Sequence, residues 1–207
     1  MVTVYLLEEV RNGLGRVTWT YSYDENYNLV AINDDRYFED FDENGMPEKM
    51  SRGAKDSGSF STLTYTADGK LEMVDHNESP FYGRKYKYDE AGNLIAEEEY
   101  ADGRLDFITM YEYDGQTLIA SHCEFAESGV FMYDTKVENG RIVEKYYKDC
   151  DPSMTYQLNY DEHGNLISEI SDDITAYSDY YTYKAVQVDA ARAPYLREQQ
   201  RHFIWMA

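Results

Sequence analysis

The chain has 207 residues, a formal net charge of −21 (19 Lys and Arg against 40 Asp and Glu) and 22 tyrosines. A chain this acidic repels phosphate backbones, so we expect no nucleic-acid partner. Two cysteines are too few for a disulfide scaffold or a paired-cysteine zinc site, and no apolar run has the length of a membrane span or the form of a signal peptide.

A turn motif recurs along the chain. Its clearest copies are YKYDEAGNLI (residues 86–95) and NYDEHGNLI (residues 159–167), and a looser copy, SYDENYNLV, has Tyr27 in the glycine position. The aromatic or apolar residue before each turn marks one repeat, and successive markers lie 18, 24, 23, 25, 24, 23 and 23 residues apart. This spacing indicates a structural repeat with a shortened terminal unit. The markers are Tyr23, Phe41, Tyr65, Tyr88, Tyr113, Val137, Tyr160 and Tyr183.

Each repeat is predicted to contain two strands and two turns. The alternation from Trp19 to Tyr23 places aromatic side chains on one face of a strand. Asn-Gly and Asp-Gly pairs, such as Asn44-Gly45 and Asn139-Gly140, tolerate the positive φ values of tight hairpin turns. We therefore predict a mainly β fold of tandem antiparallel hairpins, with roughly 14 to 16 strands. Because strand twist accumulates in long open sheets, we expect one long curved or spiralled meander sheet with Tyr and Leu side chains on its inner face.

The composition changes at the C-terminus. From about Ala190 to Phe203 the chain is rich in Ala, Arg, Glu and Gln, with Pro194 near the start, and this pattern is typical of a short α-helix. Leu196, Gln200 and Phe203 share a side that would cover the open end of the sheet. We expect a hairpin-repeat domain over residues 1–188 and a helix packing on or capping the sheet over residues 189–207; a frayed tail is the alternative.

The pattern Y-x-Y-D-x-x-G-N-L, found from Tyr86 to Leu94 and nearly so from Leu158 to Leu166, resembles the YD repeat of the bacterial Rhs/YD-repeat family. The resemblance extends over about residues 18–186 and is weaker at the other units. It implies an all-β hairpin array in a bacterial protein, commonly secreted or attached to the cell surface. Members of this family have been linked to carbohydrate binding, but the repeat carries no fixed set of binding residues.

The chemically reactive side chains do not form a recognisable catalytic motif. The four histidines are scattered, and His163 occupies a turn position that is Ala91 in the sister repeat. His122 and Cys123 are adjacent in a strand, so their side chains should point to opposite faces. With Cys123 opposite Met132, and Met132 opposite Tyr147, the thiols of Cys123 and Cys150 lie too far apart for a disulfide, and we predict both to be free.

Two acidic features resemble functional sites. Residues 40–45 match the first half of a calcium loop, but Ser51 stands where the bidentate Glu belongs and the segment is in phase with the repeat, so a hairpin turn is predicted. Paired carboxylates such as Asp172 and Asp173 are expected throughout so acidic a chain and do not indicate glycoside hydrolysis. Rows of Tyr and Trp could stack on sugar rings; Trp19 and Trp205 are the best candidates, although a role in the core explains the rows as well.

The sequence therefore predicts a protein that is not an enzyme, with no catalytic, cofactor-binding or metal-binding residues. We expect a repeat scaffold that serves as a binding or adhesion module outside the bacterial cytoplasm, with a glycan or protein ligand. The alternative is an acidic cytoplasmic interaction protein, such as an inhibitor or immunity protein that neutralises a basic toxin by electrostatic steering.

Overall fold

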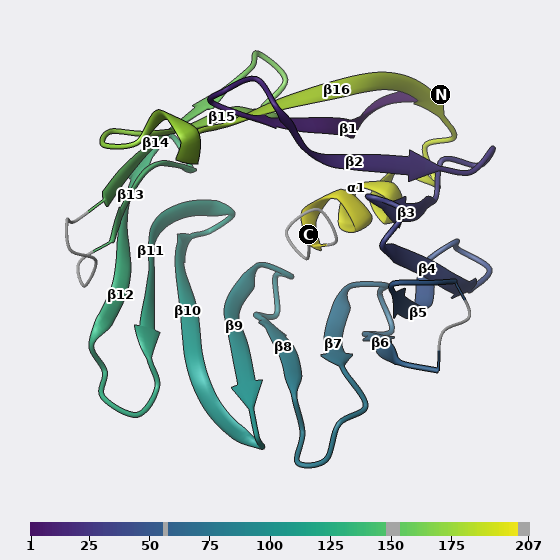
Figure 1. Ribbon diagram of the computed structural model, residues 1–207, viewed down its shortest axis with the longest axis horizontal. Helices are drawn as coiled ribbons and strands as arrows, with labels where there is room; N and C mark the ends of the chain where they lie inside the picture. Colours follow the sequence, from purple (N-terminus) through teal and green to yellow (C-terminus); the bar gives the residue numbers. More distant parts are fainter. Residues whose placement is uncertain (56–57, 148–153, 203–207) are drawn as a thin grey trace. The chain divides into compact units, whose positions relative to one another are not determined.

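The structure is a computed structural model that describes residues 1–55, 58–147 and 154–202 (Figure 1). Sixteen strands and one α-helix are present in this part of the chain. The strands are β1 (Val2–Asn12), β2 (Val17–Tyr23), β3 (Leu29–Ile32), β4 (Arg36–Phe41), β5 (Pro47–Arg52), β6 (Phe60–Tyr65), β7 (Leu71–Asp75), β8 (Gly83–Tyr88), β9 (Leu94–Ala101), β10 (Arg104–Asp114), β11 (Thr117–Phe125), β12 (Phe131–Glu138), β13 (Arg141–Tyr147), β14 (Met154–Tyr160), β15 (Leu166–Ser171) and β16 (Asp179–Val188). The helix is α1 (Ala193–His202).

The strands form an antiparallel hairpin meander, as the repeat predicts. The expected open, spiralled sheet is wrong, however, because the strand order closes into a barrel: β1 is hydrogen-bonded to β2 and also to β16. The N-terminal strand β1 carries no turn motif and was not predicted. The Gln187 amide donates to the Thr3 hydroxyl at 2.8 Å, which links the first and last strands.

The chain divides into two compact units. Unit 1 comprises residues 1–11, 15–77 and 181–207, and unit 2 comprises residues 12–14 and 78–180. Each unit is described by itself below.

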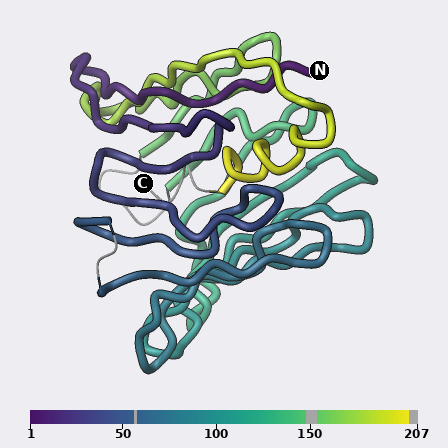
Figure 2. Tube along the Cα trace, turned by 90° about the vertical axis from the view of Figure 1, so that its right-hand side faces the viewer, coloured from purple at the N-terminus to yellow at the C-terminus, as the bar shows by residue number. Residues whose placement is uncertain are grey.

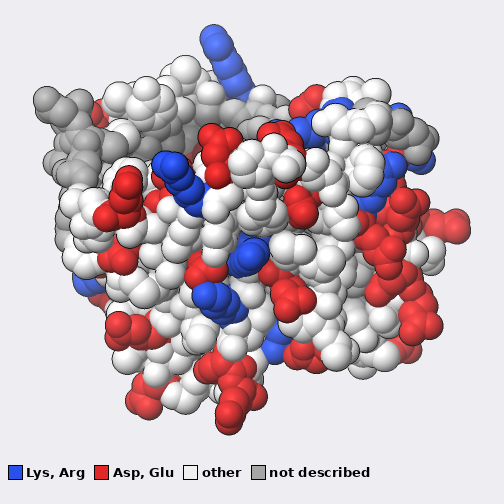
Figure 3. Space-filling model, turned by 90° about the horizontal axis from the view of Figure 1, so that it is seen from below, with Lys and Arg blue, Asp and Glu red and all other residues white. Residues whose placement is uncertain are grey.

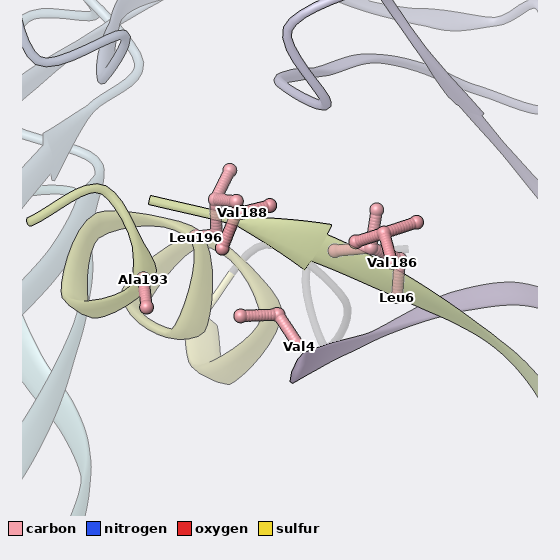
Figure 4. Packing of buried hydrophobic residues seen from close by; sticks show 6 residues of the cluster. All are labelled: Val4, Leu6, Val186, Val188, Ala193 and Leu196. Carbon is pink, nitrogen blue, oxygen red and sulfur yellow. The ribbon is translucent and has the colours of Figure 1, made fainter. Parts of the chain in front are cut away.

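In unit 1, the predicted C-terminal helix is confirmed as α1, and it packs against strands from both ends of the chain (Figure 2). A core cluster of buried side chains joins α1 to β1 and β16 (Figure 4). Burying each Val or Leu side chain of this cluster contributes about 1.5–3 kcal/mol. The cluster consists of Val4, Leu6, Val186, Val188, Ala193 and Leu196.

Three consecutive helix side chains also bind the backbone of the strands. Glu198, Gln199 and Gln200 accept hydrogen bonds from the backbone N–H groups of Leu71, Leu29 and Leu7, at 3.1, 3.0 and 2.8 Å respectively. Gln200 thus lies on the side of the helix that was predicted to cover the sheet. Phe203, predicted on the same side, lies outside the described residues. The helix thus satisfies buried backbone donors that would otherwise be costly.

The Asp of the repeat motif fixes the turn that follows it. In the copy over residues 158–166, Asp161 Oδ1 accepts from the backbone N–H groups of His163 and Asn165, and Oδ2 accepts from the Asn165 side-chain amide. Asp89 makes the same pair of bonds to Asn93, and Asp24 to Asn28. A side chain that accepts local backbone bonds in this way favours a turn. In the first copy Tyr27 adopts the φ of +66° that glycine adopts elsewhere.

The predicted hairpin turn at Asn44-Gly45 is present, and it is longer than two residues, since Phe41 pairs with Pro47 across it. Of these two residues only Gly45 has a positive φ, 71°. Asp42 Oδ1 accepts hydrogen bonds from the backbone N–H groups of Asn44 and Met46. A two-residue turn with two positive φ values does occur at Asn139-Gly140, with φ values of 52° and 76°. The repeat motif therefore makes a longer loop than a simple Asn-Gly hairpin.

Candidate ligand-binding face

One face of the unit 2 sheet carries a continuous row of directly opposed residues. The register pairs Tyr86 with Glu97, Glu97 with Thr109, Thr109 with Cys123, Cys123 with Tyr133, and Tyr133 with Tyr147. Residues directly opposite one another project from the same face of a sheet, so this row crosses six strands on one side. We call this surface the tyrosine face; it comprises the row just given together with Lys145, Tyr156, Glu169 and Asp179.

Three half-buried rings lie in series at one end of the tyrosine face. The ring centroids of Tyr133 and Tyr147 are 5.3 Å apart, and those of Tyr147 and Tyr156 are 5.7 Å apart. The interplanar angles of 48° and 69° are tilted and edge-on, arrangements that aromatic pairs prefer over a face-to-face sandwich. Tyr86 and Cys123 of the same row are only 5% and 4% exposed, whereas Tyr133, Tyr147 and Tyr156 are half-buried, so the accessible part of the tyrosine face lies at this end.

One ion pair lies beside these rings, and others lie at the opposite end of the tyrosine face, near Tyr86. Lys145 Nζ lies 3.1 Å from Glu169 Oε1, and Lys145 is the register partner of Tyr156. On β8, Arg84 bridges Glu99 at 3.0 Å and Glu97 at 3.5 Å. These charges are held in fixed positions by their partners, which orients their remaining donors and acceptors.

Burial controls the protonation of this face. It raises the pKa of Tyr133 to about 12, against a smaller opposing effect of a hydrogen bond with Thr109. Burial also raises the pKa of Tyr86 and of Tyr147. These phenols therefore remain neutral at physiological pH and act as hydrogen-bond donors as well as acceptors. Burial, followed by the charge of its register partner Glu169, raises the pKa of Asp179.

The predicted relation of Cys123 to its neighbours needs one correction. Cys123 lies opposite Tyr133, not Met132, because a bulge between Cys123 and Glu124 leaves Met132 as the additional residue. Cys123 is a buried free thiol, as predicted, and Cys150 lies outside the described residues. Neighbouring His122 packs its ring edge-on against Phe131, with centroids 4.9 Å apart.

The other sequence candidates fall elsewhere. His163 is exposed in its turn, as predicted, and Trp205 lies outside the described residues. Trp19 is half-buried in unit 1, with the Arg36 guanidinium 5.4 Å from its ring centroid. The calcium-like segment forms the hairpin turn described above, and within residues 1–55, 58–147 and 154–202 no group of three or more His, Cys, Asp or Glu is placed to hold a metal ion.

The turn at residues 41–45 lines a pocket of about 310 Å³ in unit 1. The Arg192 guanidinium donates to Asn28 Oδ1 at its wall, and Asn28 is itself held by Asp24. Asn28 is thus engaged on both sides, whereas the Nη1 atom of Arg192 is buried and makes no hydrogen bond. The lining residues are Asn26, Asn28, Phe41, Asp42, Glu43, Asn44, Gly45 and Arg192.

Sequence reasoning did not single out the tyrosine face. The alternation of tyrosines is visible in the sequence, but packing of these side chains in the core explains it as well as a ligand-binding surface does. Only the register shows that Tyr133 and Tyr147 are directly opposed and share a face with Lys145. In the part of the chain that the structure describes, no helix has the length and apolar composition needed to cross a membrane.

Comparison with known proteins gives distant structural neighbours. No family model and no curated protein matches the chain. The crystal structure of TcdB2-TccC3 is 13% identical with a TM-score of 0.33, over 81% of this chain and 13% of the other. The Photorhabdus luminescens Tc holotoxin pore is 15% identical with a TM-score of 0.25, over 81% and 13%. The TcdB2-TccC3-Cdc42 structure is 15% identical with a TM-score of 0.26, over 86% and 12%. The chain thus spans a small fraction of the length of these neighbours.

Proposed function

We propose that the protein is a non-enzymatic, YD-repeat-like binding module that acts outside the bacterial cytoplasm, and that it binds a glycan on the tyrosine face. The observation that carries this proposal is the series of half-buried rings of Tyr133, Tyr147 and Tyr156 beside the Lys145–Glu169 ion pair.

This combination suits a saccharide. A sugar ring has an apolar face that packs against an aromatic ring, and hydroxyl groups at its rim that need fixed donors and acceptors. Neutral tyrosine hydroxyls and a held ion pair supply both kinds of group, while the rings supply the apolar contact. The resemblance of residues 86–94 and 158–166 to a repeat of secreted bacterial proteins supports the proposed location.

A glycan array tests the proposal with matched variants. The wild type is expected to bind at least one glycan, and Tyr147→Ala is expected to lose that binding. Tyr180→Ala is the control, because Tyr180 is exposed and alternates to the other face from Asp179. Thermal unfolding of each variant checks that it is folded. Absence of binding to any glycan, or equal loss in both variants, would contradict the proposal.

A second candidate is an acidic cytoplasmic interaction protein that neutralises a basic toxin. It is favoured by the net charge of −21 and by the carboxylates that are spread over the surface in Figure 3. Such charge accelerates association with a cationic partner. The coding sequence upstream of Met1 separates the two candidates: a secretion or lipoprotein signal there contradicts the cytoplasmic candidate, and an adjacent toxin gene favours it.

A further inference from the structure

Two arginines face each other in unit 1, in spite of the acidity of the chain. Arg36 on β4 is the direct register partner of Arg52 on β5. Like charges in directly opposite positions of a sheet destabilise it. No ion pair to a carboxylate relieves either residue in the described part of the chain. The carboxylate of Asp35 raises the pKa of Arg36, but this effect is smaller than the lowering caused by the charge of Arg52.

Arg36 lies on the buried side of the sheet, and its partner Arg52 is exposed at the end of β5. The register joins Tyr21 to Ile32, Ile32 to Arg36 and Arg36 to Arg52 in one row across four strands. Tyr21 and Ile32 are 7% and 0% exposed, so the face they share is the interior one. Trp19, two residues before Tyr21, lies under the Arg36 guanidinium.

Two of the three guanidinium nitrogens of Arg36 lack acceptors. These atoms, Nε and Nη1, are buried and make no hydrogen bond. Burial, followed by the charge of Arg52, lowers the pKa of Arg36. A buried charged donor without an acceptor costs free energy, and such a group in a native structure generally indicates a missing water or ion.

We infer that Arg36 and Arg52 form a binding site for a tetrahedral oxyanion, a phosphate or a sulfate, either free or as the ester group of a larger ligand. Neighbouring strands lie about 4.8 Å apart, so both guanidinium groups can reach one anion. The two positive charges of the guanidinium groups balance the charge of a dianion. The oxygens of the anion can accept hydrogen bonds from the N–H groups of both arginines. The Trp19 ring holds the Arg36 guanidinium in place through a cation–π contact.

The net charge of −21 does not prevent this binding. Exposed charges more than about 8 Å away are largely screened at physiological ionic strength, whereas the two guanidinium groups act at contact distance. The inference is independent of the proposed glycan ligand, because the arginine pair and the tyrosine face belong to different units. Loss of glycan binding would leave it unchanged.

Isothermal titration of the full chain with inorganic phosphate and with sulfate tests the inference. The wild type is expected to bind one or both anions saturably. Arg52→Gln, at an exposed strand end, is expected to weaken binding by at least about tenfold, because a charge-assisted hydrogen bond is lost. Arg104→Gln, an exposed arginine of unit 2, is the control and should bind as the wild type does. Absence of saturable binding, or equal affinity in Arg52→Gln, overturns the inference.

Thermal unfolding of Arg36→Met provides a second readout. Replacing an uncompensated buried charge by an apolar side chain of similar length should raise the unfolding temperature in anion-free buffer. Phosphate should stabilise the wild type and leave the variant unaffected, since only a protein that binds the ligand gains stability from it. Equal stabilisation of both proteins by phosphate contradicts the assignment of the site to Arg36.

Discussion

The hydroxyl of Tyr160 donates a hydrogen bond to the carbonyl of Ile142, 2.8 Å away in the preceding repeat. The motif tyrosines Tyr65 and Tyr23 donate in the same way to the carbonyls of Pro47 and Leu7. The phenol at the marker position therefore links each of these turns to the strand or turn that precedes it in the sheet. This link explains in physical terms why tyrosine occurs so often at the marker position.

Tyr160→Phe is expected to lower the free energy of unfolding by about 0.5–1.5 kcal/mol, the net contribution of one such hydrogen bond, while the ring still fills its site. Urea unfolding measures the loss. Tyr180→Phe, which removes an exposed hydroxyl, should leave stability unchanged. A Tyr160→Phe protein as stable as the wild type would show that the bond adds nothing between repeats.

Gln199 holds α1 to the strands of unit 1. Its side chain is 1% exposed, accepts from the Leu29 N–H and donates to the Gly45 carbonyl at 2.7 Å. Gln199→Ala leaves both backbone groups without their partner, and we expect a loss of about 2–4 kcal/mol in urea unfolding. Arg197→Ala, on the exposed side of the same helix, should change stability by less than about 0.5 kcal/mol. Similar losses in the two variants would refute a specific role of the Gln199 amide.

The turn after β8 should respond to acid. The Asn93 side-chain amide, followed by the Asn93 backbone N–H, lowers the pKa of Asp89. A carboxyl whose pKa is lowered by folding contributes stability above its unfolded pKa of about 3.9, and that contribution is lost as pH falls through the folded value. The stability advantage of the wild type over Asp89→Asn should thus be constant between about pH 5 and 7, decrease below about pH 4 and disappear once the pH is below the folded pKa.

Urea unfolding at a series of pH values measures this advantage. The matched control is Glu90→Gln, which neutralises the neighbouring exposed carboxylate while leaving the turn's bonds to Asp89 in place. An advantage over Asp89→Asn that persists unchanged at pH 2–3 would contradict the role of the charged carboxylate.

Cys123 should be chemically inert in the folded protein. Its side chain is 4% exposed, and burial raises the pKa of the thiol, so little reactive thiolate is present. In a Cys150→Ser background, which leaves one thiol, reaction with Ellman's reagent should be slow in native buffer and complete in urea. Fast reaction in native buffer would mean that β11 opens readily or that the thiol is accessible.

The repeat could be predicted from the sequence because its turns are encoded locally. The aspartates Asp89 and Asp161 bind residues only two to four positions away, so the motif and the turn coincide. Closure of the sheet could not be predicted in this way. It depends on β1, which has no motif, and on contacts such as that between Thr3 and Gln187.

The tyrosine face was hidden for a related reason. The bulge that leaves Met132 unpaired shifts the register by one residue, and a one-residue shift exchanges the two faces of a strand. Alternation along β12 therefore could not reveal that Tyr133 meets both Cys123 and Tyr147. Likewise, the Arg36–Arg52 pair follows from the length of the β4–β5 turn, which composition does not disclose.

The side chain of Gln200 binds the backbone of Leu7, 193 positions earlier in the chain. During synthesis β1 can pair with β2 as soon as that strand emerges, but its contacts with β16 and α1 form only after the intervening residues have been made. Non-local contacts of this kind slow folding, since the chain entropy of a long loop is lost before the contact forms. The hairpins of unit 2 have local partners and can form first, so the N-terminal strands should be the segment most in need of protection from aggregation in the cell.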